Sequence, residues 1–141
     1  MVRAGQHIES RSTGERVRFL RTAADTDGAL LEFESWWPPG DRAGAHVHPN
    51  MEERWEVLAG RARFRIGDVE HEAGPGEAVV ARAGVAHRAF NPGPELAHLR
   101  MSMRPALDWE DFMVALFALD PRDGAGLREL LRHHAHLVRP S

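Results

Sequence analysis

Hydrophobic and polar residues alternate through most of the first hundred positions. In the segment 29–37, Leu31 and Phe33 alternate with Glu32 and Glu34, so that one face is apolar and the other is charged. A period of two residues is typical of a strand with one buried face. Similar short runs recur as far as residue 104. The pattern predicts eight strands, at residues 16–22, 29–37, 54–58, 61–66, 69–72, 77–82, 87–90 and 96–104.

Glycine and proline separate these runs. Pro38-Pro39-Gly40 ends the second run, Gly67-Asp68 can form a hairpin turn, and Gly74-Pro75-Gly76 interrupts the chain again. Many short strands at regular spacing with such turns favour an all-β sandwich or barrel over an α/β fold. The fold class predicted from the pattern is therefore all-β.

The periodicity becomes helical only after Ala106. Asp108 can cap a first helix, which Asp120-Pro121 would end, and a second amphipathic helix is predicted over 126–138. We therefore expect a barrel with its N-terminal strands over residues 1–105. A short helical extension, residues 106–141, is expected to pack on the same domain. The apolar positions of the two helices are Trp109, Phe112, Met113, Leu116 and Phe117, then Leu127, Leu130, Leu131 and Leu137.

Composition excludes several classes of protein. The 141 residues match one ordinary domain, and the absence of cysteine excludes disulfides, zinc-thiolate sites and thiol nucleophiles. The 18 basic and 21 acidic residues are spread along the chain, which argues against a nucleic-acid partner. No apolar run approaches the length of a membrane span or of a secretory leader. We expect no membrane partner and a cytoplasmic location.

Two histidines in an extended segment are the first candidates for chemistry. His46 and His48 are separated by one residue, so their side chains point to the same face of a strand. They are about 6.5–7 Å apart along the backbone, which is close enough to converge on one ion. Glu53 begins the next strand and His87 begins a later one. These two can join the histidine pair only if the strands roll into a barrel.

The spacing of these four residues occurs within two longer motifs. Residues 40–60 read G-DRAGA-H-V-H-PNME-E-RWEVLA-G, and residues 76–91 read G-EAVVA-R-A-G-VA-H-RAF-N. They resemble the two motifs of the cupin superfamily, G-x5-H-x-H-x4-E-x6-G and G-x5-P-x-G-x2-H-x3-N. The sequence departs from them only at Arg82, where the family usually has proline, and the turn before His87 is expected to be looser for it.

The resemblance implies a double-stranded β-helix, or jelly-roll, barrel that binds one divalent transition metal ion through His46, His48, Glu53 and His87. Glu52 is the alternative carboxylate, but the spacing to the next motif glycine favours Glu53. Imidazole with a carboxylate suits iron, manganese, nickel or zinc, and the sequence does not choose among them.

Cupins include oxygenases, isomerases, cyclases and non-catalytic binding modules, so the resemblance leaves the function open. The first hypothesis is a dioxygenase-like metalloenzyme that acts on a small organic molecule bearing oxygen. The alternatives are a non-redox cyclase or isomerase with a Lewis-acid metal, and a non-catalytic module that binds a small ligand. Phe33 and Trp55 are candidates for the wall of the substrate pocket. The resemblance also favours a homodimer.

The roles of two groups of polar residues stay open. His98, Arg100 and Ser102 share one face of the last strand, which could line the pocket or face solvent. His133, His134 and His136 lie near the end of the second predicted helix, where imidazoles favourably complement the helix dipole. A second metal site there is the alternative.

Overall fold

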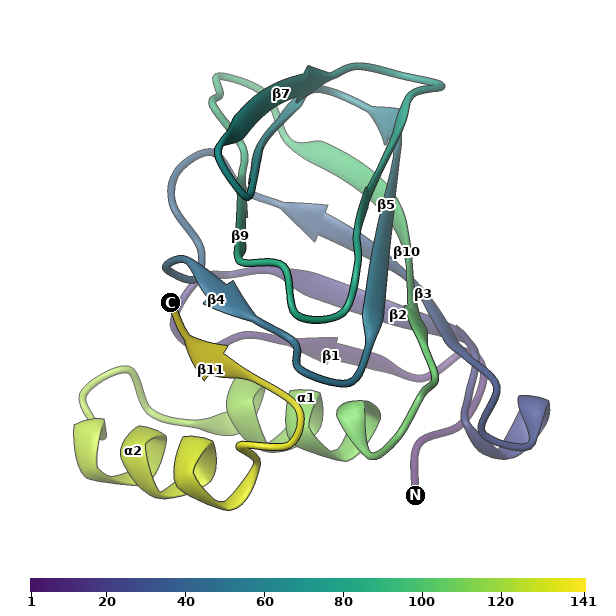
Figure 1. The fold of residues 1–141 in the computed structure, drawn as a ribbon, viewed down its shortest axis with the longest axis vertical. Helices are drawn as coiled ribbons and strands as arrows, with labels where there is room; N and C mark the ends of the chain where they lie inside the picture. The colour runs from purple at the N-terminus through teal and green to yellow at the C-terminus, as the bar shows by residue number, and fades with distance from the viewer.

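A computed structural model describes residues 1–141 and contains eleven strands, a short 3-10 helix and two α-helices (Figure 1). The elements are β1 (His7–Glu9), β2 (Arg16–Arg21), η1 (Ala24–Thr26), β3 (Leu31–Trp37), β4 (His46–Val47), β5 (Glu52–Ala59), β6 (Ala62–Ile66), β7 (Val69–Ala73), β8 (Ala78–Ala81), β9 (His87–Phe90), β10 (Ala97–Arg104), α1 (Trp109–Ala118), α2 (Gly124–His133) and β11 (Arg139–Pro140).

The strands form two antiparallel sheets. One has the order β1-β2-β3-β10-β5-β8, and the other has the order β11-β4-β9-β6-β7. The buried residues of both sheets belong to a single hydrophobic core. The predicted all-β, double-stranded β-helix barrel is therefore confirmed.

The register of β10 shows which of its faces is buried. Met101 pairs with Phe33 on one side and with Trp55 on the other, and these residues are all buried. His98 and Arg100 point to the opposite face of the sheet. There the His98 ring stacks on Trp36 at a centroid distance of 4.6 Å. Neither His98 nor Arg100 lines the main cavity. The solvent-facing alternative therefore holds for His98 and Arg100, while Ser102 of the same strand is largely buried.

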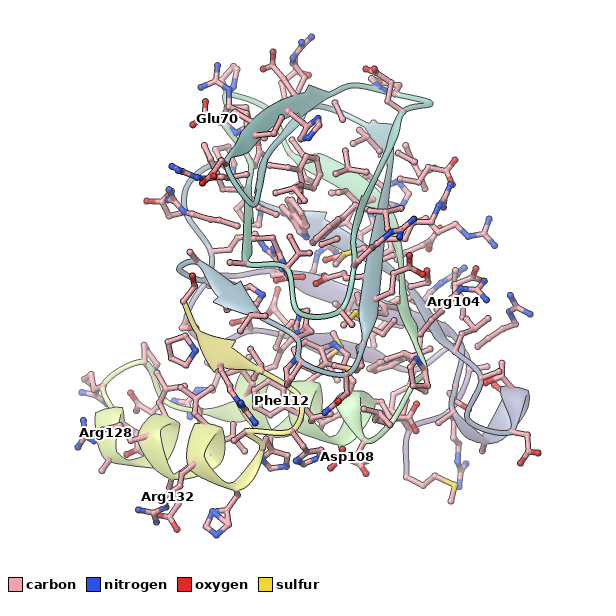
Figure 2. All side chains as sticks on the ribbon, viewed as in Figure 1. Glu70, Arg104, Asp108, Phe112, Arg128 and Arg132 are labelled. Atoms are coloured by element: carbon pink, nitrogen blue, oxygen red, sulfur yellow. The ribbon has the colours of Figure 1, made fainter.

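Helix α1 crosses one end of the barrel, and α2 lies on the outer side of α1 (Figure 1). Phe112 lies on the barrel side of α1, whereas Arg128 and Arg132 project from the far side of α2 (Figure 2). Phe112 is buried and both arginines are exposed, as amphipathic helices packed on a core require. Neither helix has the length and apolar character that crossing a bilayer requires.

The second helix was predicted over 126–138. It begins two residues earlier, at Gly124, and ends five residues earlier, at His133. Asp123 caps its start by accepting a hydrogen bond from the Gly126 amide. The chain then turns back, and Leu137 is completely buried outside the helix. The last residues form β11, which pairs with β4, and the amide of Ser141 donates to the carbonyl of Ala45 at 3.0 Å.

The three histidines near this turn do not converge on one point that could hold a metal ion. The rings of His133 and His134 bond through Nδ1 to carbonyls of the last helical turn, at 3.0 and 2.7 Å. His136 lies beyond the helix, where its Nε2 is 2.8 Å from a carboxylate oxygen of Asp108. That contact connects the segment after α2 to the start of α1.

Candidate metal centre

The two motifs bring their four polar residues together in the barrel. His46 on β4 pairs directly with His87 on β9, and Glu53 lies on β5 of the other sheet. One donor atom from each residue of the set His46, His48, Glu53 and His87 lies within 4.8 Å of the others. Residues 41 positions apart in the chain are therefore adjacent across one pair of strands.

Backbone carbonyls orient all three imidazole rings in the same way. Nδ1 of His46 is 2.8 Å from the carbonyl of Gly44, and Nδ1 of His87 is 3.1 Å from that of Val85. Nδ1 of His48 is 2.8 Å from the carbonyl of Leu137. A carbonyl oxygen only accepts hydrogen bonds, so each Nδ1 carries the proton. Each neutral ring therefore presents the lone pair of Nε2.

The group that faces these Nε2 atoms is a carboxylate, which has no hydrogen to donate to them. Oε1 of Glu53 lies 2.9 Å from Nε2 of His48 and 3.2 Å from Nε2 of His87. A neutral Nε2 and a carboxylate are both acceptors, so the arrangement needs a proton or a cation between them. Three imidazole nitrogens and one carboxylate oxygen are a donor set that fits a divalent transition metal ion.

In the metal-free protein, a proton on Nε2 takes the place of the cation between an imidazole and the carboxylate. Burial by itself would raise the pKa of Glu53, but hydrogen bonds from His48 and His87 hold that pKa well below its usual range. Burial would lower the pKa of His48, yet its contacts with Glu53 and with the Leu137 carbonyl raise that pKa overall. His46 has no such direct contact with the carboxylate, and burial lowers its pKa to about 4.

The choice between the two adjacent glutamates follows from strand alternation. Glu53 shares a face with the buried residues Trp55 and Val57 of β5, whereas Glu52 points to the opposite face. Gly60 follows directly after the strand, and an added Cβ there would lie 2.6 Å from the Leu96 carbonyl oxygen. This close approach of two backbones explains the motif glycine.

Arg82 does not open the turn before His87. The Val85 amide donates to the Arg82 carbonyl at 3.1 Å, and the Gly84 amide donates to the carbonyl of His48 at 2.8 Å. Gly84 has a φ of +82°, which glycine adopts without strain. Backbone hydrogen bonds thus connect the two motifs at the site.

A cavity of about 470 Å³ lies against the cluster. Its wall contains His46, Glu53 and His87 from the barrel, together with apolar residues from the C-terminal elements. Those apolar residues are Trp109, Phe112, Leu116, Phe117, Leu127, Leu131, Val138 and Pro140.

The structure separates the two residues expected in the pocket wall. Trp55 lines the cavity, and its ring lies 5.3 Å from that of His87. Phe33 does not line the cavity. It is 1% exposed and packs in the barrel core, with its ring 6.3 Å from that of Phe19. Strand alternation placed Phe33 on the inner face correctly, but it could not give the position along the barrel axis.

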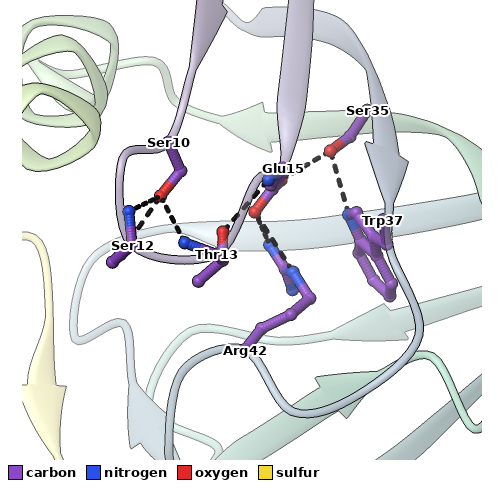
Figure 3. Close-up of polar contacts among 7 residues, drawn as sticks. All are labelled: Ser10, Ser12, Thr13, Glu15, Ser35, Trp37 and Arg42. Atoms are coloured by element: carbon purple, nitrogen blue, oxygen red, sulfur yellow. Dashed lines mark hydrogen bonds and ion pairs between the residues drawn. The ribbon is translucent and has the colours of Figure 1, made fainter. Parts of the chain in front are cut away.

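Sequence reasoning missed a polar network in the same cavity wall (Figure 3). Glu15 is 4% exposed and accepts two hydrogen bonds from Arg42, of 2.7 and 3.2 Å. It also accepts from the Ser35 hydroxyl, which in turn accepts from the Trp37 indole at 2.9 Å. The network joins residues far apart in the chain, and Arg42 lies at a variable position of the first motif. No local pattern could have revealed it.

Comparisons with known proteins agree with the fold. The family model for the cupin domain matches residues 35–103. Protein SchB of Streptomyces halstedii is 34% identical over 98 residues, which cover 68% of this chain and 70% of SchB.

Two solved structures show the same fold. An RmlC-like cupin from Shewanella frigidimarina has a TM-score of 0.62 and 22% identity, over 74% of this chain and 86% of that one. A predicted oxalate decarboxylase from Thermotoga maritima has a TM-score of 0.61 and 20% identity, over 74% and 98% of the two chains. The chain belongs to the cupin family.

Proposed function

We propose that this protein is a metal-dependent, dioxygenase-like enzyme that acts on an apolar organic molecule bearing oxygen atoms. The observation that carries the proposal is the convergence of three imidazole rings and the Glu53 carboxylate beside a cavity with many apolar residues in its wall. His46, His48, Glu53 and His87 would hold the metal ion. Four protein ligands would leave room for substrate oxygen on an ion that takes five or six ligands.

The cavity wall supports the choice of substrate class. A volume of about 470 Å³ is in the usual range of small-molecule sites. Every residue that α1, α2 and β11 contribute to the wall is apolar. Such a wall excludes water and favours aromatic or other hydrocarbon surface. The protein would therefore bind a substrate whose body is apolar and whose oxygens face the histidine cluster.

The ionisable groups of the wall support the choice of reaction class. Apart from the proposed ligands, only Glu15 and Arg42 are ionisable, and they are bonded to each other. No side chain is therefore free to act as a general acid or base, which a cyclase or isomerase would use. A bound metal ion supplies Lewis acidity, and iron also supplies access to dioxygen. The chain's own residues would bind and orient the substrate and exclude water.

The metal can be tested directly. Untagged protein analysed by elemental mass spectrometry should contain about one transition metal ion per chain. The double variant His46→Ala/His87→Ala should contain almost none. The matched control His71→Ala/His133→Ala removes two exposed histidines outside the cluster and should keep the metal. Full metal content in the first variant would contradict the proposal.

The proposed reaction class can be tested by whether turnover requires dioxygen. Protein loaded with Fe(II) and supplied with 1-hydroxy-2-acetonaphthone, a chelating aromatic ketone, should consume dioxygen faster than the double variant does. Turnover that is equal under anaerobic conditions and with zinc would identify a non-redox cyclase or isomerase instead. Binding of the ketone without any turnover would indicate a ligand-binding module.

A further inference from the structure

The guanidinium of Arg42 is held rigidly in the cavity wall. Two of its nitrogens, Nε and Nη2, donate to the same carboxylate oxygen of Glu15. Its carbon lies 3.9 Å above the ring centroid of Trp37, a cation–π distance. The Trp37 indole and the Ser35 hydroxyl fix the other oxygen of Glu15 through the hydrogen-bond chain of Figure 3. Arg42 is therefore fixed by contacts on its edge and on its face.

The third nitrogen of this guanidinium has no protein partner. Nη1 carries two N–H donors, and neither forms a hydrogen bond with the protein. The side chain is 19% exposed, so the group is neither deeply buried nor freely mobile. Arg42 is one of the residues that line the cavity, and a molecule bound there can accept hydrogen bonds from this free Nη1 edge.

Glu15 lines the cavity together with Arg42, but its carboxylate oxygens are already occupied. Both of its carboxylate oxygens accept hydrogen bonds, one from the guanidinium and the other from the Ser35 hydroxyl. Glu15 also balances the charge of Arg42, so this part of the wall is polar without a strong positive field. Such a site selects an oxygen atom by hydrogen bonding rather than by charge.

We propose that Arg42 is a substrate-positioning residue that binds a hydrogen-bond-accepting oxygen, of a carbonyl or a carboxylate, on the apolar substrate. The inference rests on the proposed function in that the cavity is the substrate site. It adds a second polar anchor apart from the histidine cluster. The substrate class becomes an apolar molecule with one oxygen group for the cluster and another for Arg42.

The test uses metal-free protein, so that its outcome is independent of the proposed metal chemistry. Two probes differ only in one group: 2-acetylnaphthalene carries a C=O where 2-isopropenylnaphthalene carries a C=CH2. Quenching of the tryptophan fluorescence measures both dissociation constants, since Trp55 and Trp109 line the cavity. The ketone should bind the wild-type protein about tenfold more tightly than the alkene, as expected for one hydrogen bond to a charged donor.

The variant Arg42→Gln should remove this preference and leave the affinity for the alkene unchanged within about twofold. The double variant Glu15→Gln/Arg42→Gln avoids an unpaired buried carboxylate and should behave in the same way. Arg88→Gln is the matched control, because Arg88 pairs with Asp41 next to Arg42 but does not line this cavity. It should keep the wild-type preference.

A third probe, 2-naphthoate, separates the two sources of oxygen. A larger loss for naphthoate than for the ketone in Arg42→Gln assigns the site to a carboxylate, and the reverse assigns it to a carbonyl. A wild-type protein without any preference for the oxygen-bearing probes would overturn the inference. So would equal losses for the ketone and the alkene in Arg42→Gln, since these would indicate a change of cavity shape only.

Discussion

The barrel and the C-terminal segment, residues 106–141, line the same cavity with different chemistry. All the ionisable groups in the wall come from the barrel and its N-terminal strands, and the eight wall residues that follow residue 105 are all apolar. The barrel holds its polar groups on hydrogen-bonded strands and turns, whereas the C-terminal segment contributes side chains from the two helices and from the chain after them. The polar groups of the cavity wall thus come from the barrel, and the C-terminal segment adds only apolar surface to it.

One of the contacts between the two parts orients a histidine of the cluster. The carbonyl of Leu137 belongs to the C-terminal segment, yet it accepts the hydrogen bond that orients His48. Such partners of metal-binding histidines fix the tautomer and the direction of the ring. The difference between the barrel and the C-terminal segment can therefore be tested at this contact and also at residues that belong to only one of the two parts.

The largest effect is expected from removal of residues 137–141. This deletion removes the carbonyl partner of His48, the buried Leu137 side chain and the pairing of β11 with β4. Metal affinity should fall by about 10–100-fold, as for other losses of such hydrogen bonds. A competition titration with a metal chelator measures it.

The matched variant Leu137→Ala keeps the carbonyl and removes only packing. It should lower the free energy of unfolding by about 2–5 kcal/mol in urea, while metal affinity stays near that of the wild type. If both proteins bound metal equally well, the carbonyl would have no part in orienting His48.

A second effect, on stability instead of metal affinity, is expected when the metal-free protein is acidified. The pKa of His46 is lowered from 6.5 to about 4 by burial, so the folded state binds fewer protons than the unfolded state between these values. Its contribution to stability is fully present above pH 6.5 and is lost as the pH falls toward 4. The loss amounts to about 3 kcal/mol.

Urea unfolding at roughly pH 7 and roughly pH 4.5 measures this loss, which His46→Gln should abolish. His48 works in the opposite direction, because its raised pKa stabilises the protein at low pH, and this contribution is lost as the pH rises through that pKa. Only the difference between the variant and the wild type therefore isolates His46. Leu137→Ala is the control from the C-terminal segment and should lower stability equally at both pH values.

The smallest effect concerns the apolar wall alone. Leu127 lines the cavity and is 39% exposed, so Leu127→Ala should hardly change stability. It should weaken binding of 2-isopropenylnaphthalene by about three- to tenfold through the lost apolar contact. Leu96→Ala is the matched control, since Leu96 is 47% exposed and lies outside the cavity. Equal affinities in both variants would show that α2 does not contact the bound molecule.

The two parts of the molecule also differ in how far the sequence predicted them. Period-two alternation predicted which residues of β3 and β10 share a face, without deciding for β10 which face is buried, and the motif spacing identified the residues that converge. In the C-terminal segment, helical periodicity wrongly included Leu137, whose burial depends on the turn after His133 and on pairing with β4. Local periodicity cannot report such long-range contacts. The homodimer and the cytoplasmic location stay predictions.

The pairing of β11 with β4 has a practical consequence for handling the protein. Ser141 donates to the carbonyl next to His46, so anything appended after Ser141 emerges beside the histidine cluster. An oligohistidine purification tag at that end could place its own imidazoles near the four ligands and compete for the ion. An affinity tag before Met1, removed by a protease, keeps added imidazoles out of every measurement of metal content.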